Sequence, residues 1–278
     1  MEIIIPEKNK NAVHPALLIK GAWSACSRNL KKLAAIYLIF NLPIAAIYLT
    51  PMASRLQNQE MTFLVFVCVF LPVLILSVWG NISLLLAASK AVCSQDYPVG
   101  QAINEAKAYF LNFLGTGLIA TVFLTGIALL GAFFVGAFFP LLIKVNKILA
   151  ISFCLIIAIV SIGFFVYFMI RWSLATVVCV LENTRPFNAL KRSLVLIAEY
   201  VNPVVGTYFL FMLIYIACLV FFAVAGMFFG AGNYGEKPGW ISAVFSLLLN
   251  VVLVPFWATL TVALHNKLKE VSESHVCS

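Results

Sequence analysis

Long uncharged apolar runs follow one another along the chain and are separated by short polar segments. Runs of about 18 or more such residues are typical of transmembrane helices, because about 20 helical residues cross the hydrocarbon core of a bilayer. Lipid offers no water to the backbone, so each run predicts a helix. Six runs meet this criterion: Leu33 to Ser54, Met61 to Ser89, Ala108 to Ile143, Ile148 to Ile170, Tyr200 to Gly235 and Pro238 to Asn266.

Three shorter segments between these runs have the pattern of amphipathic helices. Each begins at a proline, a residue that the first turn of a helix tolerates, and apolar residues then recur at steps of three and four. The three apolar faces hold Leu18, Ala22, Cys26 and Leu30; Val99, Ile103, Ala106 and Phe110; and Phe187, Leu190, Leu194 and Ile197. We expect three amphipathic surface helices on the cytoplasmic side of the membrane.

The order of these elements predicts an internal repeat. Each amphipathic segment precedes two apolar runs, and the second run ends near a tryptophan, which prefers the headgroup level of the bilayer. Because two spans return the chain to its starting side, such repeats are parallel. The alternative is chance similarity among the loops of a six-span protein. We predict one integral membrane domain over residues 1–278, with degenerate repeats at 15–92, 98–183 and 186–270.

Composition and charge agree with a membrane location. Hydrophobic residues make up 63% of the 278 residues and charged residues 10%, whereas about a quarter is usual for a soluble domain. Thirteen of the eighteen Lys and Arg residues lie in the segments predicted to be cytoplasmic, and four lie in the opposite loops. This bias predicts the cytoplasmic membrane with both termini cytoplasmic. It also explains the net charge of +8, so we expect no nucleic-acid partner.

The residue types that carry catalysis or bind metals are scattered. None of the seven cysteines lies in a predicted outer loop, and their spacing matches no metal-binding pattern. The three histidines, His14, His265 and His275, are far apart, and no Ser-His-Asp set or paired carboxylates stand out. We therefore expect a protein that is not an enzyme and has no cofactor and no metal site.

The segment that follows the fourth apolar run resembles a known family. The residues concerned are Arg171 to Ala175 (RWSLA), Glu182 and Ala189 to Ser193 (ALKRS), together with Lys31-Lys32 and Pro255-Phe256-Trp257. They resemble the integral-membrane domain associated with bacterial glycerophosphodiester phosphodiesterases and related six-span proteins. The resemblance implies a six-helix membrane domain with no assigned chemistry. Catalysis does not carry over, because the acidic and histidine metal ligands of the phosphodiesterase barrel have no counterpart here.

Arg171 is the most informative charge, because a guanidinium at the centre of a bilayer costs roughly 2.5 to 3.5 kcal/mol. One interpretation is that it lies near the interface and extends to water. A second is a lipid-headgroup site formed by Arg171, Lys191 and Arg192, since the planar donors of arginine suit phosphate. A third is a buried ion pair, for which the predicted charge partners are Glu105, Glu182 and Glu199.

These observations favour a non-enzymatic membrane protein that binds lipid or acts as a scaffold or accessory protein. Its expected partners are membrane lipids with anionic headgroups, and a protein partner or a homo-oligomer is a further option. A small-solute permease or channel is the alternative function. No ionisable group lies well inside a predicted span, which disfavours proton- or ion-coupled transport.

Overall fold

The computed structural model describes residues 13–49, 62–228 and 240–274, and all regular structure in these ranges is α-helical. The chain divides into two compact units. One comprises Met1–Phe110 and Asn202–Ser278, and is called the terminal unit below. The other comprises Leu111–Val201, and is called the central unit. Each unit has its own buried core.

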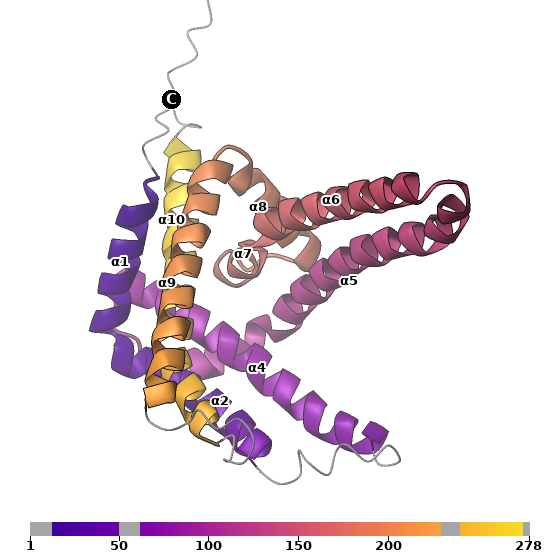
Figure 1. Cartoon of the computed structure of the whole chain (residues 1–278). Helices are drawn as coiled ribbons and strands as arrows, with labels where there is room; N and C mark the ends of the chain where they lie inside the picture. Colours follow the sequence, from indigo (N-terminus) through magenta and orange to yellow (C-terminus); the bar gives the residue numbers. More distant parts are fainter. Residues whose placement is uncertain (1–12, 50–61, 229–239, 275–278) are drawn as a thin grey trace, which may run out of the picture. The chain divides into compact units, whose positions relative to one another are not determined.

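The terminal unit is organised around α10 (Trp240–Ser274), which packs against α1 (Pro15–Arg28), α2 (Leu30–Leu49) and α4 (Thr62–Val92). α9 (Val201–Phe228) runs beside α1 and α10 (Figure 1). The first part of α5 (Val99–Val145) also belongs to this unit. Burying large aliphatic side chains is the main favourable contribution to such packing. The most buried are Leu33, Ile36, Ile82, Leu260, Leu264 and Leu268.

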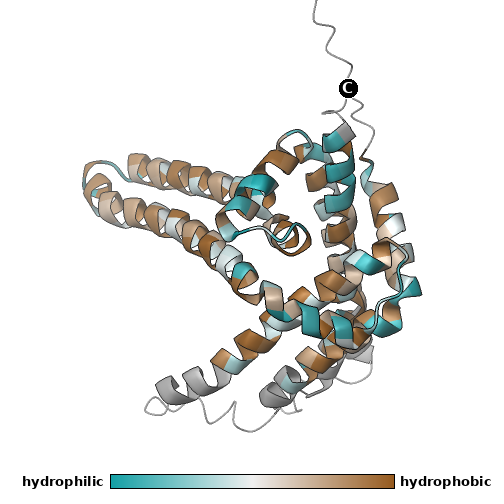
Figure 2. Ribbon diagram, turned by 180° about the vertical axis from the view of Figure 1, so that it is seen from behind, coloured by the Kyte–Doolittle hydropathy of each residue, from teal (hydrophilic) through white to brown (hydrophobic). Residues whose placement is uncertain are grey.

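The central unit is a long helical hairpin followed by two short helices. Its elements are the rest of α5, α6 (Lys147–Trp172), α7 (Ala175–Leu181) and α8 (Pro186–Ala198). Asn146 caps α6, because its side-chain oxygen accepts hydrogen bonds from the Ile148 and Leu149 amides. Figure 2 shows mostly hydrophobic residues along both arms of the hairpin. The small core of this unit joins α7 to α8 through Val178, Cys179, Ala189 and Leu196.

The prediction of an all-α membrane bundle is confirmed. Within the described residues, five helices are long and apolar enough to cross a membrane, and they correspond to the second to sixth predicted spans. The first predicted span, Leu33 to Ser54, coincides with α2, and its last residues lie outside the described ranges. The predicted outer loop at 232–238 also lies outside them. The five helical segments are Leu71–Val92, Val99–Val145, Lys147–Leu181, Val201–Phe221 and Leu247–Glu273.

The three predicted amphipathic segments are helical, and part of each apolar face is buried within the protein. In α1, Ala22 and Cys26 are buried, and in α8, Leu190 and Ile197 are buried. The second segment has no helix-breaking residue at its end, so it continues directly into the third span as part of α5. Contact of these helices with a membrane surface therefore stays a prediction.

Each unit contains a notch in which a glycine of one helix faces the first proline of another. A Cβ atom added to Gly115 in α5 would lie 2.9 Å from Pro186 Cγ in α8. One added to Gly206 in α9 would lie 3.2 Å from Pro15 Cγ in α1. Both glycines are followed by a threonine. The recurrence agrees with the predicted repeat, which nevertheless remains a prediction.

Candidate functional site

The end of α6 and the middle of α8 are joined by a reciprocal pair of hydrogen bonds. The hydroxyl of Ser193, which is fully buried, donates to the carbonyl oxygen of Arg171 at 2.7 Å. Arg171 Nη1 in turn donates to the carbonyl oxygen of Leu194 at 3.2 Å. Each bond satisfies a backbone oxygen of the partner helix. The pair therefore fixes both the position of α8 on α6 and the direction of the Arg171 side chain.

The remaining donors of Arg171 define the candidate site. The guanidinium carbon lies 5.1 Å from the ring centre of Tyr167, a distance that allows a cation–π interaction. Arg171 Nε is buried and has no hydrogen-bond partner among the described residues. A guanidinium has its donors in one plane, and two of them on one edge suit bidentate binding of a phosphate or carboxylate.

The other two predicted headgroup ligands lie differently from Arg171. Arg192 pairs with Glu182, with 3.4 Å between Nε and Oε2, and the side chains are 35% and 14% exposed. The sequence did not predict this pair. It forms because the chain turns between α7 and α8, where Asn183 has a φ of 48°. Lys191 is exposed beside the pair.

The other two predicted charge partners have the following positions. Glu105 lies in the terminal unit and accepts hydrogen bonds from the Tyr97 hydroxyl at 2.5 Å and from the Gln101 amide at 2.7 Å. Glu199 is exposed and directly follows α8. The ion pairs formed among the described residues do not include Arg171. A buried ion pair is therefore not what holds this guanidinium in place.

The outer face of α8 carries an apolar and cationic stripe. Phe187 and Val195 are 72% and 59% exposed, and the exposed Lys191 lies midway between them at steps of four residues. Sequence periodicity had grouped Phe187 with the buried face, and this was wrong. The contacts of α8 with α6 and α7 cover Ala189, Leu190, Leu196 and Ile197 instead, so Phe187 points away from the core.

An aromatic cluster closes the hairpin next to Arg171. Phe123 of α5 lies 5.0 Å from both Phe168 and Trp172 of α6, measured between ring centres. The Trp172 indole nitrogen is buried without a partner among the residues described. In the terminal unit the equivalent nitrogen of Trp79 donates to the Ile103 carbonyl at 2.8 Å. The bond from Arg171 to Leu194 takes the corresponding role of joining a span end to the following amphipathic helix.

Trp79, Trp172 and Trp257 each lie near the end of a predicted span, and the residues before them show that packing alone does not require a charge at that position. Val78 precedes Trp79, and Phe256 precedes Trp257, whereas Arg171 precedes Trp172. Phe256 is almost fully buried and packs against Trp23 of α1, with 5.3 Å between the ring centres. An apolar residue therefore suffices at two of the three junctions, so the charge of Arg171 calls for a separate explanation.

Several polar side chains near the link between α4 and α5 in the terminal unit interact with one another. Lys32 forms an ion pair with Asp96, and this ammonium lowers the pKa of the Asp96 carboxyl below its usual value. Burial and the neighbouring Glu105 raise the pKa of the Tyr97 hydroxyl. Lys107 lies over the ring of Trp79 at 5.6 Å. These side chains stabilise the link between α4 and α5, and they form no pocket of convergent acids and bases.

Buried hydroxyls inside the helices do not outline a polar path. Thr116, Thr207 and Thr259 each donate to a carbonyl four residues earlier in the same helix, at 2.7 to 2.8 Å. Such bonds satisfy the hydroxyl locally and leave no donor for a passing solute. In the ranges that the structure describes, no group of His, Cys, Asp and Glu residues is arranged to hold a metal ion.

Comparisons of the chain with models of protein families, with curated proteins and with solved structures find no match. The resemblance to the membrane domain associated with glycerophosphodiester phosphodiesterases rests on the residues quoted above, and it stays a prediction.

Proposed function

We propose that this membrane protein is not an enzyme and that it binds the anionic headgroups of phospholipids at the junction of α6 and α8. The observation that carries the proposal is the Arg171 guanidinium, which is fixed by Leu194 and Tyr167 and keeps a buried Nε–H without an acceptor among the described residues. An unsatisfied buried donor calls for an explanation such as a ligand or an ion. A phosphate supplies two acceptor oxygens on one side.

The exposed stripe of α8 supports the same proposal. Phe187 and Val195 are apolar and Lys191 is cationic, a combination suited to the boundary between acyl chains and anionic headgroups. Lys191 adds positive charge beside the site. Arg192 contributes less, because Glu182 already balances its charge. In this proposal the protein lies in the cytoplasmic membrane with both termini in the cytoplasm, and the site faces the inner leaflet.

Lipid retention tests the proposal. Wild type and Arg171→Ala are purified in mild detergent with excess phosphatidylglycerol and phosphatidylcholine, and bound lipid is counted by native mass spectrometry. A hydrogen bond to a charged group contributes about 1.5–3 kcal/mol, so we expect Arg171→Ala to weaken phosphatidylglycerol binding by about 10-fold or more. Arg171→Lys keeps the charge without the planar donors, and we expect an intermediate loss.

Arg185→Ala is the matched control, because it removes an exposed arginine just before α8. We expect it to change phosphatidylglycerol binding by less than about twofold, since exposed charges contribute little. Equal binding of the two lipids by wild type would contradict the proposed function. So would an equal loss from Arg185→Ala and Arg171→Ala, because it would indicate attraction to net charge rather than a built site.

A further inference from the structure

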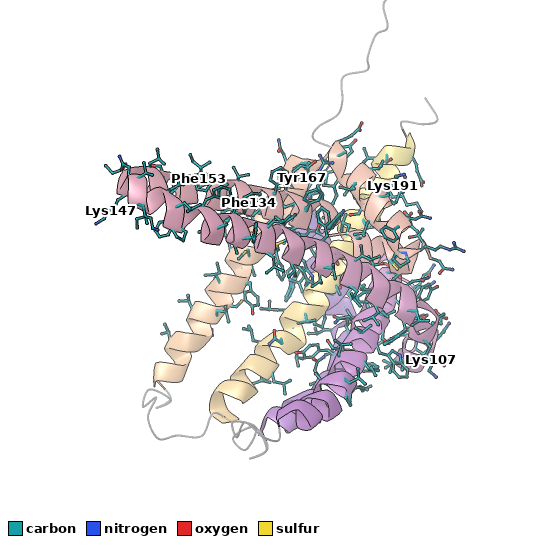
Figure 3. The ribbon with its side chains drawn as sticks, turned by 90° about the vertical axis from the view of Figure 1, so that its right-hand side faces the viewer. Lys107, Phe134, Lys147, Phe153, Tyr167 and Lys191 are labelled. Carbon is teal, nitrogen blue, oxygen red and sulfur yellow. The ribbon has the colours of Figure 1, made fainter. Side chains whose placement is uncertain are left out.

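The two arms of the central hairpin enclose an apolar groove. Its volume is about 380 Å³, within the range of ligand sites in proteins. Figure 3 shows the hairpin that contains it, with Lys147 at the tip, Phe134 and Phe153 along the arms, and Tyr167 towards the other end. Small side chains make the hollow, since α5 and α6 carry little bulk there. The groove is lined in part by Ala128, Gly131, Ala132, Ala158, Ser161 and Phe165.

The groove opens to the hydrocarbon of the bilayer. Only 6% of the apolar window of each hairpin helix is buried within the protein, so nearly all of its surface faces outwards. No charged residue occurs from Ala108 to Ile143 or from Ile148 to Ile170. In this medium the attraction comes from close packing rather than from the hydrophobic effect. A flexible hydrocarbon chain is the occupant that fits such walls and is present in the medium itself.

The groove lies on the same helix as Arg171, at a depth that matches one leaflet. Phe165 and Ser161 precede Arg171 in α6, by six and ten positions, which correspond to about 9 Å and about 15 Å along a helix at 1.5 Å per residue. Half of a hydrocarbon core of about 30 Å is also about 15 Å. An acyl chain that begins at a headgroup on Arg171 therefore reaches the groove before it reaches the middle of the bilayer.

The aromatic cluster lies between Arg171 and the groove, along the path proposed for the acyl chain. Phe123, Phe168 and Trp172 fill the space between the arms just below Arg171, so an acyl chain passes over these rings before it enters the hollow. We propose that the α5–α6 groove holds the acyl chain of the phospholipid whose headgroup binds Arg171. This inference rests on the proposed headgroup site, and it adds that the protein recognises the lipid by its chain as well as by its charge.

Photo-crosslinking tests the inference on the full-length protein in lipid nanodiscs. The probes are phosphatidylglycerol and phosphatidylcholine, each with a diazirine near the end of one acyl chain, and cross-linked peptides are located by mass spectrometry. From the preference proposed for the headgroup site, we expect the phosphatidylglycerol probe to label groove-lining peptides of α5 and α6 at least about fivefold more than the phosphatidylcholine probe does. Ala158→Phe, which fills the groove from an exposed lining position, should abolish this difference.

Ala137→Phe is the matched control, because Ala137 is exposed on α5 and does not line the groove. It should leave the labelling unchanged. If wild type prefers phosphatidylglycerol in the retention assay but its labelling is spread evenly over the hairpin, the groove inference is overturned and the headgroup site stands. In a second experiment with a bifunctional protein cross-linker, cross-links between two copies that Ala158→Phe removes would also overturn it, because a second copy would then occupy the groove. If wild type instead retains phosphatidylglycerol and phosphatidylcholine equally, the proposed function is overturned.

Discussion

Replacing Ser193 by alanine tests whether the hydroxyl–carbonyl bond holds α8 against α6. The Ser193 side chain is fully buried, and its hydroxyl lies 2.7 Å from the Arg171 carbonyl oxygen. Ser193→Ala removes one oxygen atom and creates almost no cavity, so the effect on stability comes from the lost bond. The carbonyl loses this donor, and α6 has ended by Trp172, so no later turn of the helix replaces it.

The expected cost follows from the burial of the Ser193 hydroxyl in a bond that is itself partly buried. Leaving a buried acceptor unsatisfied costs about 1–3 kcal/mol, more than the net value of an exposed hydrogen bond. For a chain of roughly this size, each kcal/mol corresponds to a change in melting temperature of about 2–4 °C. We therefore expect Ser193→Ala to lower the melting temperature by about 2–12 °C. The measurement is thermal unfolding in detergent, with the fraction of protein that stays monodisperse as the readout.

A matched serine provides the control. Ser24 is exposed on α1, and the same substitution there should change the free energy of unfolding by less than about 0.5 kcal/mol. Ser193→Ala should also loosen Arg171, because Leu194 is the next residue of the same turn. Melting curves of Ser193→Ala and Ser24→Ala that coincide within about 1 °C would refute this account of the junction.

Three further predictions concern other parts of the chain. Gly115→Ala should destabilise the protein by about 1–3 kcal/mol in thermal unfolding, because overpacking against the first proline of α8 is costly, whereas Gly117→Ala meets no atom within 4 Å and should be neutral or stabilising. The lysine partner of Asp96 lowers the pKa of its carboxyl in the folded protein. The ion pair therefore stabilises the fold at pH values above the pKa that Asp96 has in the unfolded chain. This stability is lost as the pH falls through the lower pKa that Asp96 has in the folded protein. Asp96→Asn should therefore melt below wild type at about pH 7 and approach it near about pH 3. Cys93 is exposed, whereas burial raises the pKa of the Cys26 thiol. A maleimide at about pH 7 should therefore label Cys93 faster than Cys26, as peptide mapping would show, and equal rates would contradict this burial.

Much of the helical framework could be predicted from apolar run length. The run from Ile148 to Ile170 became α6 within two residues at each end, because a charge or a polar cap marks both ends. Asn146 is the cap at one end, and Arg171 with Trp172 marks the other. Run length failed where no breaker was present. The second amphipathic segment and the third span form one helix because nothing in the sequence between them interrupts it.

The candidate site was predictable only in part. Sequence singled out Arg171 because a charge at the end of an apolar run is costly, and that reasoning does not depend on tertiary structure. Its acceptor could not be predicted, since the carbonyl of Leu194 is a backbone group that any residue would supply. The partner of Glu182 could not be predicted either, because the chain turns between α7 and α8, where Asn183 has a φ of 48°, and this turn lies between Glu182 and Arg192.

Periodicity also could not identify what covers a helix face. The steps of three and four residues correctly grouped Leu190 with Ile197, and both are buried. They grouped Phe187 with the same face, although it is 72% exposed. The periodicity of apolar residues predicts which side chains share one face of a helix. Which of them are buried depends on the helices that pack against that face.

The glycine–proline notches bear on how such a chain arose. In each notch the proline comes from the predicted repeat that follows in sequence, or from the first repeat in the case of Gly206 and Pro15. If the repeats descend from duplication of a shorter gene, the ancestral product had a notch that its own proline did not fill. It would have needed other copies of itself to do so, and a self-associating ancestor is the evolutionary history that these two contacts imply.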